Sequence, residues 1–315
     1  MDDFMQKPLR LLHYDDSQTE WVLLRFSAIV RNRVTHVLLC STLLLVAIAT
    51  FSFTNPWAKT QSAAVESALP AISSSKISIL PLGDSITQGQ GSTHLNGYRG
   101  PLKASLDDLR LESVFIGSQR AGDMANNEHE GYPGLIINHI LMRIQMDSIL
   151  SHRPDVVLLH AGTNDMAHDA SRQYWKGASA RLEILLDDIL RVVPNATVMV
   201  AQIMQASLEG FKERIDEYNV AIPGLVAARA QAGAKIMDVD MSNIGAGGTH
   251  LVDGAHPDDT GYAMMADVWL AGLKSATQKG WIGWPQAIDP ENDSIEEAFE
   301  HWQESHNSDE TLPQG

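Results

Sequence analysis

Hydrophobic positions between residues 76 and 280 alternate between short apolar runs and longer stretches with helical spacing. The short runs contain few polar residues, which is typical of strands buried on both faces of a sheet. They predict strands at Lys76–Leu82, Ser113–Ile116, Asp155–His160, Thr197–Gln202 and Lys235–Val239. The stretches between them predict helices at Arg99–Leu109, Leu135–Leu150, Tyr174–Val193, Phe211–Ala232 and Asp259–Thr277. This alternation predicts an α/β domain with a parallel sheet covered by helices on both faces.

Residues 34–53 (VTHVLLCSTLLLVAIATFSF) are apolar in a different way, because the run is continuous and holds no Asp, Glu, Lys or Arg. Twenty helical residues at ~1.5 Å each span roughly 30 Å, the thickness of a bilayer core. Four arginines precede the run, whereas Lys59 and Lys76 are the only cations in residues 54–76. The positive-inside bias therefore predicts an anchor with its N-terminus in the cytosol. The alternatives are a buried core helix and a cleaved signal peptide.

These patterns divide the chain into five parts. We expect a cytosolic segment at 1–33, a transmembrane anchor at 34–53, a stalk at 54–75, a catalytic domain at 76–285 and an acidic disordered tail at 286–315. The stalk is rich in Ser and Ala and can bury little surface. We therefore expect a single-pass membrane protein with a lumenal or extracellular domain. The alternative is a protein secreted after signal cleavage. Asn195 and Asn292 begin glycosylation sequons that could be used there.

Charge and cysteine content narrow the classes of partner. The formal net charge is −16 and the pI is about 5.0, which argues against nucleic acid because phosphate binding needs a basic surface. Cys40 is the only cysteine, so an intrachain disulfide and a zinc site built from cysteines are excluded. The sequence does not indicate an oligomeric state.

Three short motifs follow predicted strands and carry the candidate chemistry. Ser85 lies in GDSIT after the first strand, Asn164 lies in GTND after the third, and Asp253 and His256 lie in DGAHP after the fifth. Each motif alone is also typical of a turn or a helix cap. Because the carboxyl ends of parallel strands meet at one edge, we expect them to converge there. Together they supply a nucleophile, a base with its orienting acid and an oxyanion donor, which are the roles that acyl transfer needs.

The sequence resembles the SGNH (GDSL-like) hydrolases, whose four sequence blocks supply Ser, Gly, Asn and His. Residues 83–87, 162–165 and 253–257 look like the first, third and last blocks. Residues 129–134 (HEGYPG) look like a variant of the second block, with Gly134 as the oxyanion glycine and Gly117 as the alternative. This run and residues 119–122 (QRAG) are similar to family 3 of the carbohydrate esterases.

The resemblance implies a three-layer α/β/α sandwich with a five-stranded parallel sheet of flavodoxin-like order. It also implies hydrolysis of small acyl esters, commonly acetylated sugars, by Ser85, His256 and Asp253, with Ser85, Gly134 and Asn164 forming the oxyanion hole. No cofactor or metal is expected. A metal cluster among Asp84, Asp165, Asp258 and Asp259 is a competing interpretation.

Two other functions stay open at this point. The first is the same chemistry on lipids, as a lysophospholipase or thioesterase. The loops at 88–97, 121–130 and 241–250 are mostly polar, charged or Gly-rich, which favours a small acyl group on a polar alcohol, such as a small molecule or a polysaccharide. The second is a carbohydrate-binding ectodomain without catalysis. Loss of catalytic side chains would indicate it, whereas Ser85, Asp253 and His256 are all present.

Overall fold

The computed structural model describes residues 76–167, 172–208, 210–284 and Phe299. The chain divides into two units, residues 1–72 and 73–315, and all described residues belong to the second. The expected anchor and stalk lie outside the described residues, as does the expected tail except for Phe299. Within the described part of the chain, no helix is long and apolar enough to cross a membrane.

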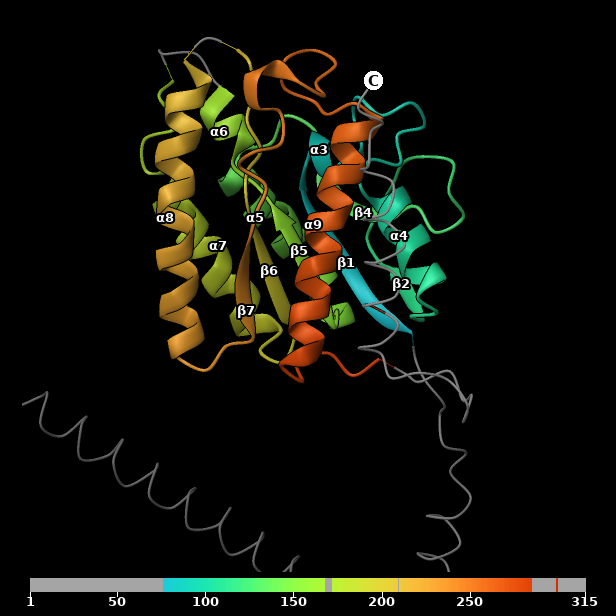
Figure 1. Ribbon diagram of the computed structural model, residues 1–315. Helices are drawn as coiled ribbons and strands as arrows, with labels where there is room; N and C mark the ends of the chain where they lie inside the picture. The colour runs from blue at the N-terminus through green and yellow to red at the C-terminus, as the bar shows by residue number, and fades with distance from the viewer. Residues whose placement is uncertain (1–75, 168–171, 209, 285–298, 300–315) are drawn as a thin grey trace, which may run out of the picture. The chain divides into compact units, whose positions relative to one another are not determined.

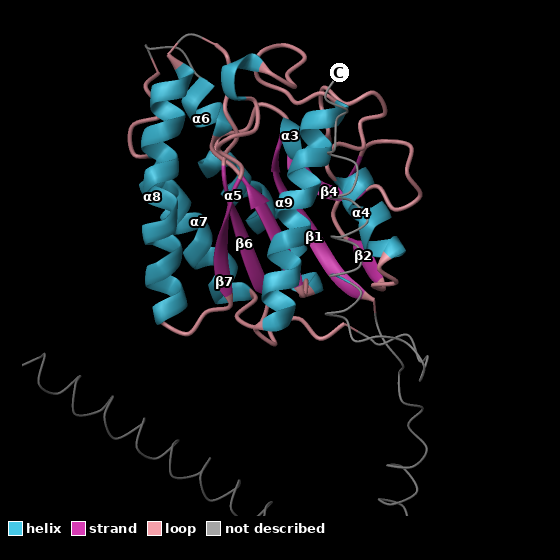
Figure 2. Cartoon of the chain, in the orientation of Figure 1, coloured by secondary structure: helices cyan, strands magenta, loops and turns pink. Residues whose placement is uncertain are grey.

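The strands form one sheet with helices packed around it (Figures 1 and 2). Continuous burial of strands such as Val156–His160 explains their nearly unbroken apolar sequence. In chain order the strands are β1 (Ile77–Asp84), β2 (Ser113–Phe115), β3 (Gln119–Arg120), β4 (Glu128–Tyr132), β5 (Val156–His160), β6 (Thr197–Gln202) and β7 (Ile236–Asp240).

Strands β1, β5, β6 and β7 run parallel as consecutive neighbours. The other edge of β1 is shared, because β2 pairs with its first half and β4 with its last residues, both in parallel. The short β3 pairs antiparallel with β4. Treated as one interrupted position, β2 and β4 complete a five-position parallel sheet in flavodoxin-like order, which confirms the expected fold class.

The helices are α3 (Ser85–Gln88), α4 (Arg99–Asp108), α5 (Ile137–Met146), α6 (Thr163–Ala167), α7 (Ala178–Val192), α8 (Phe211–Gln231) and α9 (Asp259–Gln278), with 3-10 turns η1 (Ile149–His152) and η2 (Ala246–Gly248). One predicted helix is divided: Ser148, with a φ of 52°, separates α5 from η1. Helix α7 begins four residues later than predicted, after Gly177.

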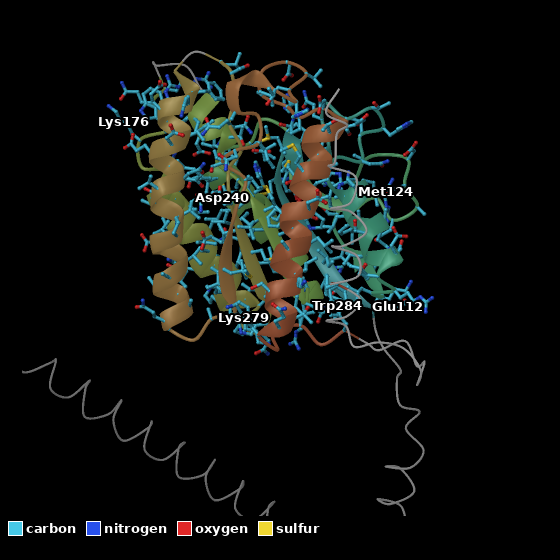
Figure 3. All side chains as sticks on the ribbon, in the orientation of Figure 1. Glu112, Met124, Lys176, Asp240, Lys279 and Trp284 are labelled. Atoms are coloured by element: carbon cyan, nitrogen blue, oxygen red, sulfur yellow. The ribbon has the colours of Figure 1, made fainter. Side chains whose placement is uncertain are left out.

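Two hydrophobic clusters fill the spaces between the sheet and its helices, and side chains project from both sheet faces into them (Figure 3). One cluster joins the sheet to α5, α7 and α8, and the other joins it to α4 and α9. Phe299 belongs to the second cluster and is 3% exposed, with Lys274 Nζ 5.7 Å from its ring centre. The domain core therefore includes one residue beyond the expected boundary at 285.

Strand β4 was not predicted from the sequence. Its sequence, EHEGY, is charged and polar, yet His129 and Glu130 are fully buried. The Glu130 carboxylate accepts hydrogen bonds from the Ser118 N–H and the Tyr132 hydroxyl. Polar partners rather than apolar packing stabilise this strand, so hydrophobic periodicity does not detect it.

Candidate active site

The sequence motifs converge at the carboxyl edge of the sheet. Ser85 begins α3 immediately after β1, and Asn164 lies in α6 just after β5. Asp253 and His256 lie in the loop before α9. The structure brings the Ser85 Oγ to 2.9 Å from His256 Nε2, and His256 Nδ1 to 2.8 Å from Asp253 Oδ2. A hydroxyl, an imidazole and a carboxylate are thus joined in one line of hydrogen bonds.

The loop that carries His256 is held in place by its own backbone. Val252 N–H donates to the His256 carbonyl at 2.9 Å, which closes a tight turn around Asp253. The other oxygen of Asp253 accepts the backbone N–H groups of Ala255 and His256, at 3.1 and 2.9 Å. Gly254 has a φ of 84°, a conformation that side chains other than glycine rarely adopt. The aspartate therefore shapes the turn and orients the imidazole with the same carboxylate.

The turn that carries Ser85 depends on close approach of two central strands. A Cβ at Gly83 would lie 2.1 Å from the backbone oxygen of His160 on β5. Asp84 caps α3, because its Oδ1 accepts the Ile86 N–H at 3.0 Å. Ser85 is only 6% exposed, so its hydroxyl is presented from a largely covered position.

Gly134 and Asn164, the candidate oxyanion donors, are linked through a neighbouring carbonyl. Asn164 Nδ2 donates one hydrogen to the Leu135 carbonyl at 3.1 Å, which leaves its second N–H for another acceptor. Gly134 has a φ of 74° and open space where a Cβ would lie. Gly117 is instead packed against the His129 backbone, where a Cβ would meet atoms at 2.3 Å. Close packing against β4 accounts for the glycine at 117, and Gly134 stays the candidate oxyanion donor.

Burial shifts the pKa values of several groups near this edge. Burial raises the pKa of Asp84 from 3.8 to about 6, and the Ile86 N–H and His256 oppose that rise. At Asp253 burial also acts to raise the pKa, but the hydrogen bonds from His256 and Ala255 outweigh it and leave the pKa lowered. Burial lowers the pKa of His129 to about 3, so this imidazole is neutral at pH 7.

Arg99 supports the site and was missed in the sequence. It is fully buried, and its guanidinium donates to five backbone carbonyls, those of Thr87, Gln88, Leu95, Ala121 and Asn127. Two of these carbonyls end α3, that of Leu95 lies in the loop after it, and the other two lie in the loop between β3 and β4. Burial lowers the pKa of Arg99. An arginine in the first turn of a helix carries no sequence signal for this role, because all its acceptors are backbone atoms.

Asp165 has a structural position rather than one in the Ser85–His256 line. It is fully buried, and its carboxylate accepts from Arg181 on α7 and from the Ile137 N–H at the start of α5. It therefore holds three helices together beneath Asn164. Within the part of the chain that the structure describes, no group of three or more His, Cys, Asp or Glu side chains is placed to hold a metal ion.

Known proteins resemble this chain in sequence and structure. The family described as GDSL-like Lipase/Acylhydrolase matches residues 82–264. A solved family 3 carbohydrate esterase from Clostridium thermocellum is 33% identical, with a TM-score of 0.54 over 63% of this chain and 98% of that one. A family 3 carbohydrate esterase from Talaromyces cellulolyticus, 24% identical, shares the fold with a TM-score of 0.54, over 64% of this chain and 99% of that one.

Two curated proteins also match. A multidomain esterase of Ruminococcus flavefaciens is 29% identical over 222 residues, which cover 62% of this chain. A protein named putative endoglucanase X, from Acetivibrio thermocellus, is 33% identical over 121 residues, which cover 38% of this chain. The matched regions span 28% and 50% of the lengths of these two relatives.

Proposed function

Because the chain belongs to the GDSL-like lipase/acylhydrolase family, we propose that it hydrolyses small acyl esters, chiefly acetyl esters of carbohydrates, through Ser85, His256 and Asp253. The family and its esterase neighbours make the chain a carboxylic ester hydrolase. The observation that carries the finer proposal is the 2.9 Å separation of Ser85 Oγ and His256 Nε2. A base at this distance can accept the hydroxyl proton as the oxygen attacks a carbonyl.

The proposed reaction has two steps. Ser85 Oγ adds to the ester carbonyl while His256 Nε2 takes its proton, and Asp253 accepts the Nδ1–H of the resulting imidazolium. His256 then returns the proton to the leaving alcohol, and the acyl group stays on Ser85. A water molecule then attacks the acyl carbonyl while His256 Nε2 takes its proton. The bond between the acyl carbon and Ser85 Oγ breaks, His256 returns the proton to Oγ, and the acid leaves. The N–H groups of Ser85 and Gly134 and the side-chain amide of Asn164 stabilise the oxyanion in both steps.

A polar alcohol is supported by the loop beside the site. Thr93 donates to Asp259 through its N–H, at 2.9 Å, and through its hydroxyl. Asn96 and His94 contact Asp123 at 2.8 and 3.0 Å. These polar groups are exposed or half-buried, as expected for a surface that contacts hydroxylated substrates. The identity of 33% to a solved family 3 carbohydrate esterase supports the same substrate class.

Replacing Ser85 with alanine tests the mechanism. We expect the full-length Ser85→Ala protein to lose nearly all hydrolysis of p-nitrophenyl acetate and of acetylated xylo-oligosaccharides, and to lose labelling by a fluorophosphonate. Ser151 lies in η1 and is exposed, so Ser151→Ala is the matched control and should behave as the unmodified protein. Normal acetyl ester turnover by Ser85→Ala would overturn the mechanism. Faster turnover of long-chain p-nitrophenyl esters than of acetate would instead favour a lipid substrate.

We also propose that residues 34–53 anchor the protein in a membrane, with the hydrolase domain on the side away from the cytosol. The continuous apolar run and the arginines before it support this location. If the anchor is correct, the full-length protein should stay with the membrane pellet after alkaline carbonate extraction. Recovery of the intact chain in the supernatant would contradict it.

A further inference from the structure

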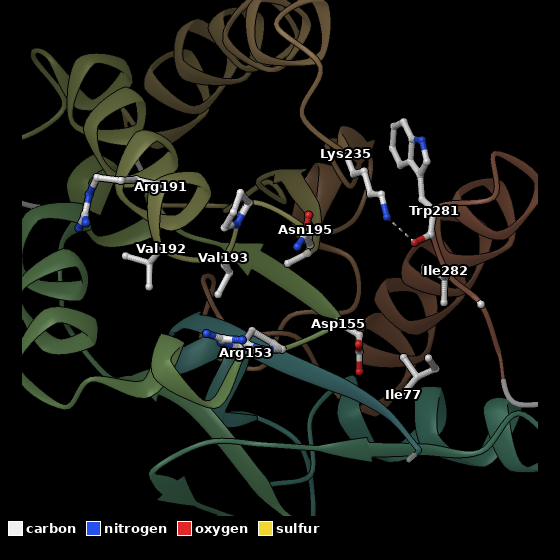
Figure 4. Close-up of a pocket in the computed structure, with 14 residues that line it drawn as sticks. Ile77, Arg153, Asp155, Arg191, Val192, Val193, Asn195, Lys235, Trp281 and Ile282 are labelled. Carbon is white, nitrogen blue, oxygen red and sulfur yellow. Dashed lines mark hydrogen bonds between the residues drawn. The ribbon is translucent and has the colours of Figure 1, made fainter. Parts of the chain in front are cut away.

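A cavity of about 620 Å³ is drawn in Figure 4. It lies where the strands begin, at the end of the sheet opposite to the one where Ser85 follows β1. It is bordered by residues at or just before the starts of four strands: Ile77 of β1, Asp155 before β5, Asn195 before β6 and Lys235 before β7. Its volume is within the range of small-ligand sites in proteins. An occupant of this cavity would not compete with an ester at Ser85.

The charge of this cavity is opposite to that of the protein. Three cationic side chains, Arg153, Arg191 and Lys235, line it together with one carboxylate, that of Asp155. Asp155 Oδ2 already accepts the N–H and the hydroxyl of Ser78, at 2.8 and 2.7 Å. In a chain with a formal net charge of −16, this concentration of cations attracts anions locally.

The Arg153 side chain is exposed, so its donors are open to solvent or to a ligand. The Arg153 guanidinium forms no hydrogen bond or ion pair with any residue that the structure describes. Its φ is 52° and Pro154 follows it, so an arginine is held where glycine would be relaxed. Strain of this kind is often found at binding sites. The fork of donors on a guanidinium matches a carboxylate with two parallel hydrogen bonds.

The other cations keep donors available. Lys235 Nζ makes one long hydrogen bond, of 3.3 Å, to the Trp281 carbonyl, which leaves two of its hydrogens. Arg191 pairs with Asp188 at 2.6 Å, but this side chain is 68% exposed and such pairs are weak. The cations come from three separate segments and stand apart around the cavity rather than at one point (Figure 4).

The spacing and the walls indicate the chemistry of the ligand. A single small ion would be bound best by donors that converge, whereas separated cations fit a ligand with several acidic and polar groups. Val193, Ile282 and Ile77 supply apolar walls, and Asn195 supplies an amide. This mixture suits sugar rings, which have apolar faces and hydroxyl edges.

We propose that this cavity is a second, non-catalytic site that binds an acidic oligosaccharide, with Arg153 and Lys235 contacting carboxylates of uronate units. The choice of a saccharide among polyanions rests on the proposed function. Such a site holds the enzyme on an acidic polysaccharide while Ser85 acts on esters at the opposite edge of the sheet.

The test uses full-length protein produced without N-glycans, because Asn195 begins a sequon within the cavity. Binding is measured by calorimetry with trigalacturonate, neutral xylotriose and inorganic phosphate. Arg153→Gly removes the charge and relieves the backbone. Arg110, which is exposed after α4 and has a φ of 55°, gives the matched control Arg110→Gly. Lys235→Gln is the second cavity variant.

We expect trigalacturonate to bind the unmodified protein and Arg110→Gly equally, and the two cavity variants roughly tenfold more weakly. Added salt should weaken binding. Hydrolysis of p-nitrophenyl acetate should be the same in all four proteins. Absence of trigalacturonate binding, equal binding by Arg153→Gly, or equal affinity for xylotriose or phosphate would each overturn the site. Retention on phosphatidylserine vesicles that falls in Arg153→Gly and Lys235→Gln but not in Arg110→Gly, without trigalacturonate binding, would overturn it in favour of a lipid surface. Binding without ester hydrolysis would refute the proposed function but not this site.

Discussion

Replacing Asp84 with asparagine should stabilise the protein at neutral pH and have a much smaller benefit near pH 4. Asp84 ends β1, is fully buried and accepts the Ile86 N–H through Oδ1, a bond that an asparagine oxygen also makes. Burial raises its pKa from 3.8 to about 6. The folded state therefore binds this proton more tightly than the unfolded state does. Protonated Asp84 therefore contributes fully to the free energy of unfolding below about pH 3.8, and this contribution is lost as the pH rises through about 6.

The size of the effect follows from the pKa difference. The shift from 3.8 to about 6 corresponds to roughly 3 kcal/mol at about 1.36 kcal/mol per unit. The group is fully buried, so solvent screening does not reduce this figure much. Asparagine carries no charge and avoids the loss above about pH 6. A fixed cost of burying its N–H₂ group affects all pH values equally and cancels when two pH values are compared.

Urea unfolding of the Asp84→Asn and unmodified proteins near pH 4 and pH 7.5 measures this difference. The stabilisation by Asp84→Asn should be about 2–3 kcal/mol greater at the higher pH. Asp108 is exposed on α4, and Asp108→Asn should change stability by less than about 0.5 kcal/mol at either pH. If the free energy of unfolding changed with pH in the same way in Asp84→Asn and in the unmodified protein, the raised pKa of Asp84 would be refuted.

Three further substitutions test the site and its support. Asn164→Ala should lower kcat about 10²–10³-fold with little change in KM, as measured with p-nitrophenyl acetate, because one oxyanion donor is lost; an unchanged kcat would remove Asn164 from the oxyanion hole. Arg99→Met should destabilise the domain by at least about 3 kcal/mol in urea unfolding, since five backbone carbonyls lose their donor. An unchanged free energy of unfolding would show that water replaces the guanidinium. Gly83→Ala should lower the free energy of unfolding by about 3 kcal/mol and lower the melting temperature, because the added Cβ would lie 2.1 Å from the His160 oxygen on a central strand. An unchanged melting temperature would contradict the tight spacing of β1 and β5.

The sequence alone determined the layered architecture and the candidate chemistry. Apolar runs such as Thr197–Gln202 became strands with the expected bounds, because a strand buried on both faces must be apolar throughout. The motifs with Ser85, Asn164 and His256 were predicted to converge because parallel strands bring their carboxyl ends to one edge. These features depend on local pattern and on general rules of sheet construction, and both can be read from a chain.

Only the tertiary structure decided the features that depend on polar contacts between distant segments. Strand β4 is mostly charged and polar, and its buried Glu130 accepts hydrogen bonds from the Ser118 N–H and the Tyr132 hydroxyl, so its sequence resembles a loop. The bonds of Arg99 go to backbone carbonyls, which every residue possesses and no sequence pattern distinguishes. Likewise, the cavity with Arg153 and Lys235 joins segments about 80 residues apart that meet only because β5, β6 and β7 lie side by side. A sequence specifies which side chains are present, but the folded chain decides which polar groups they meet.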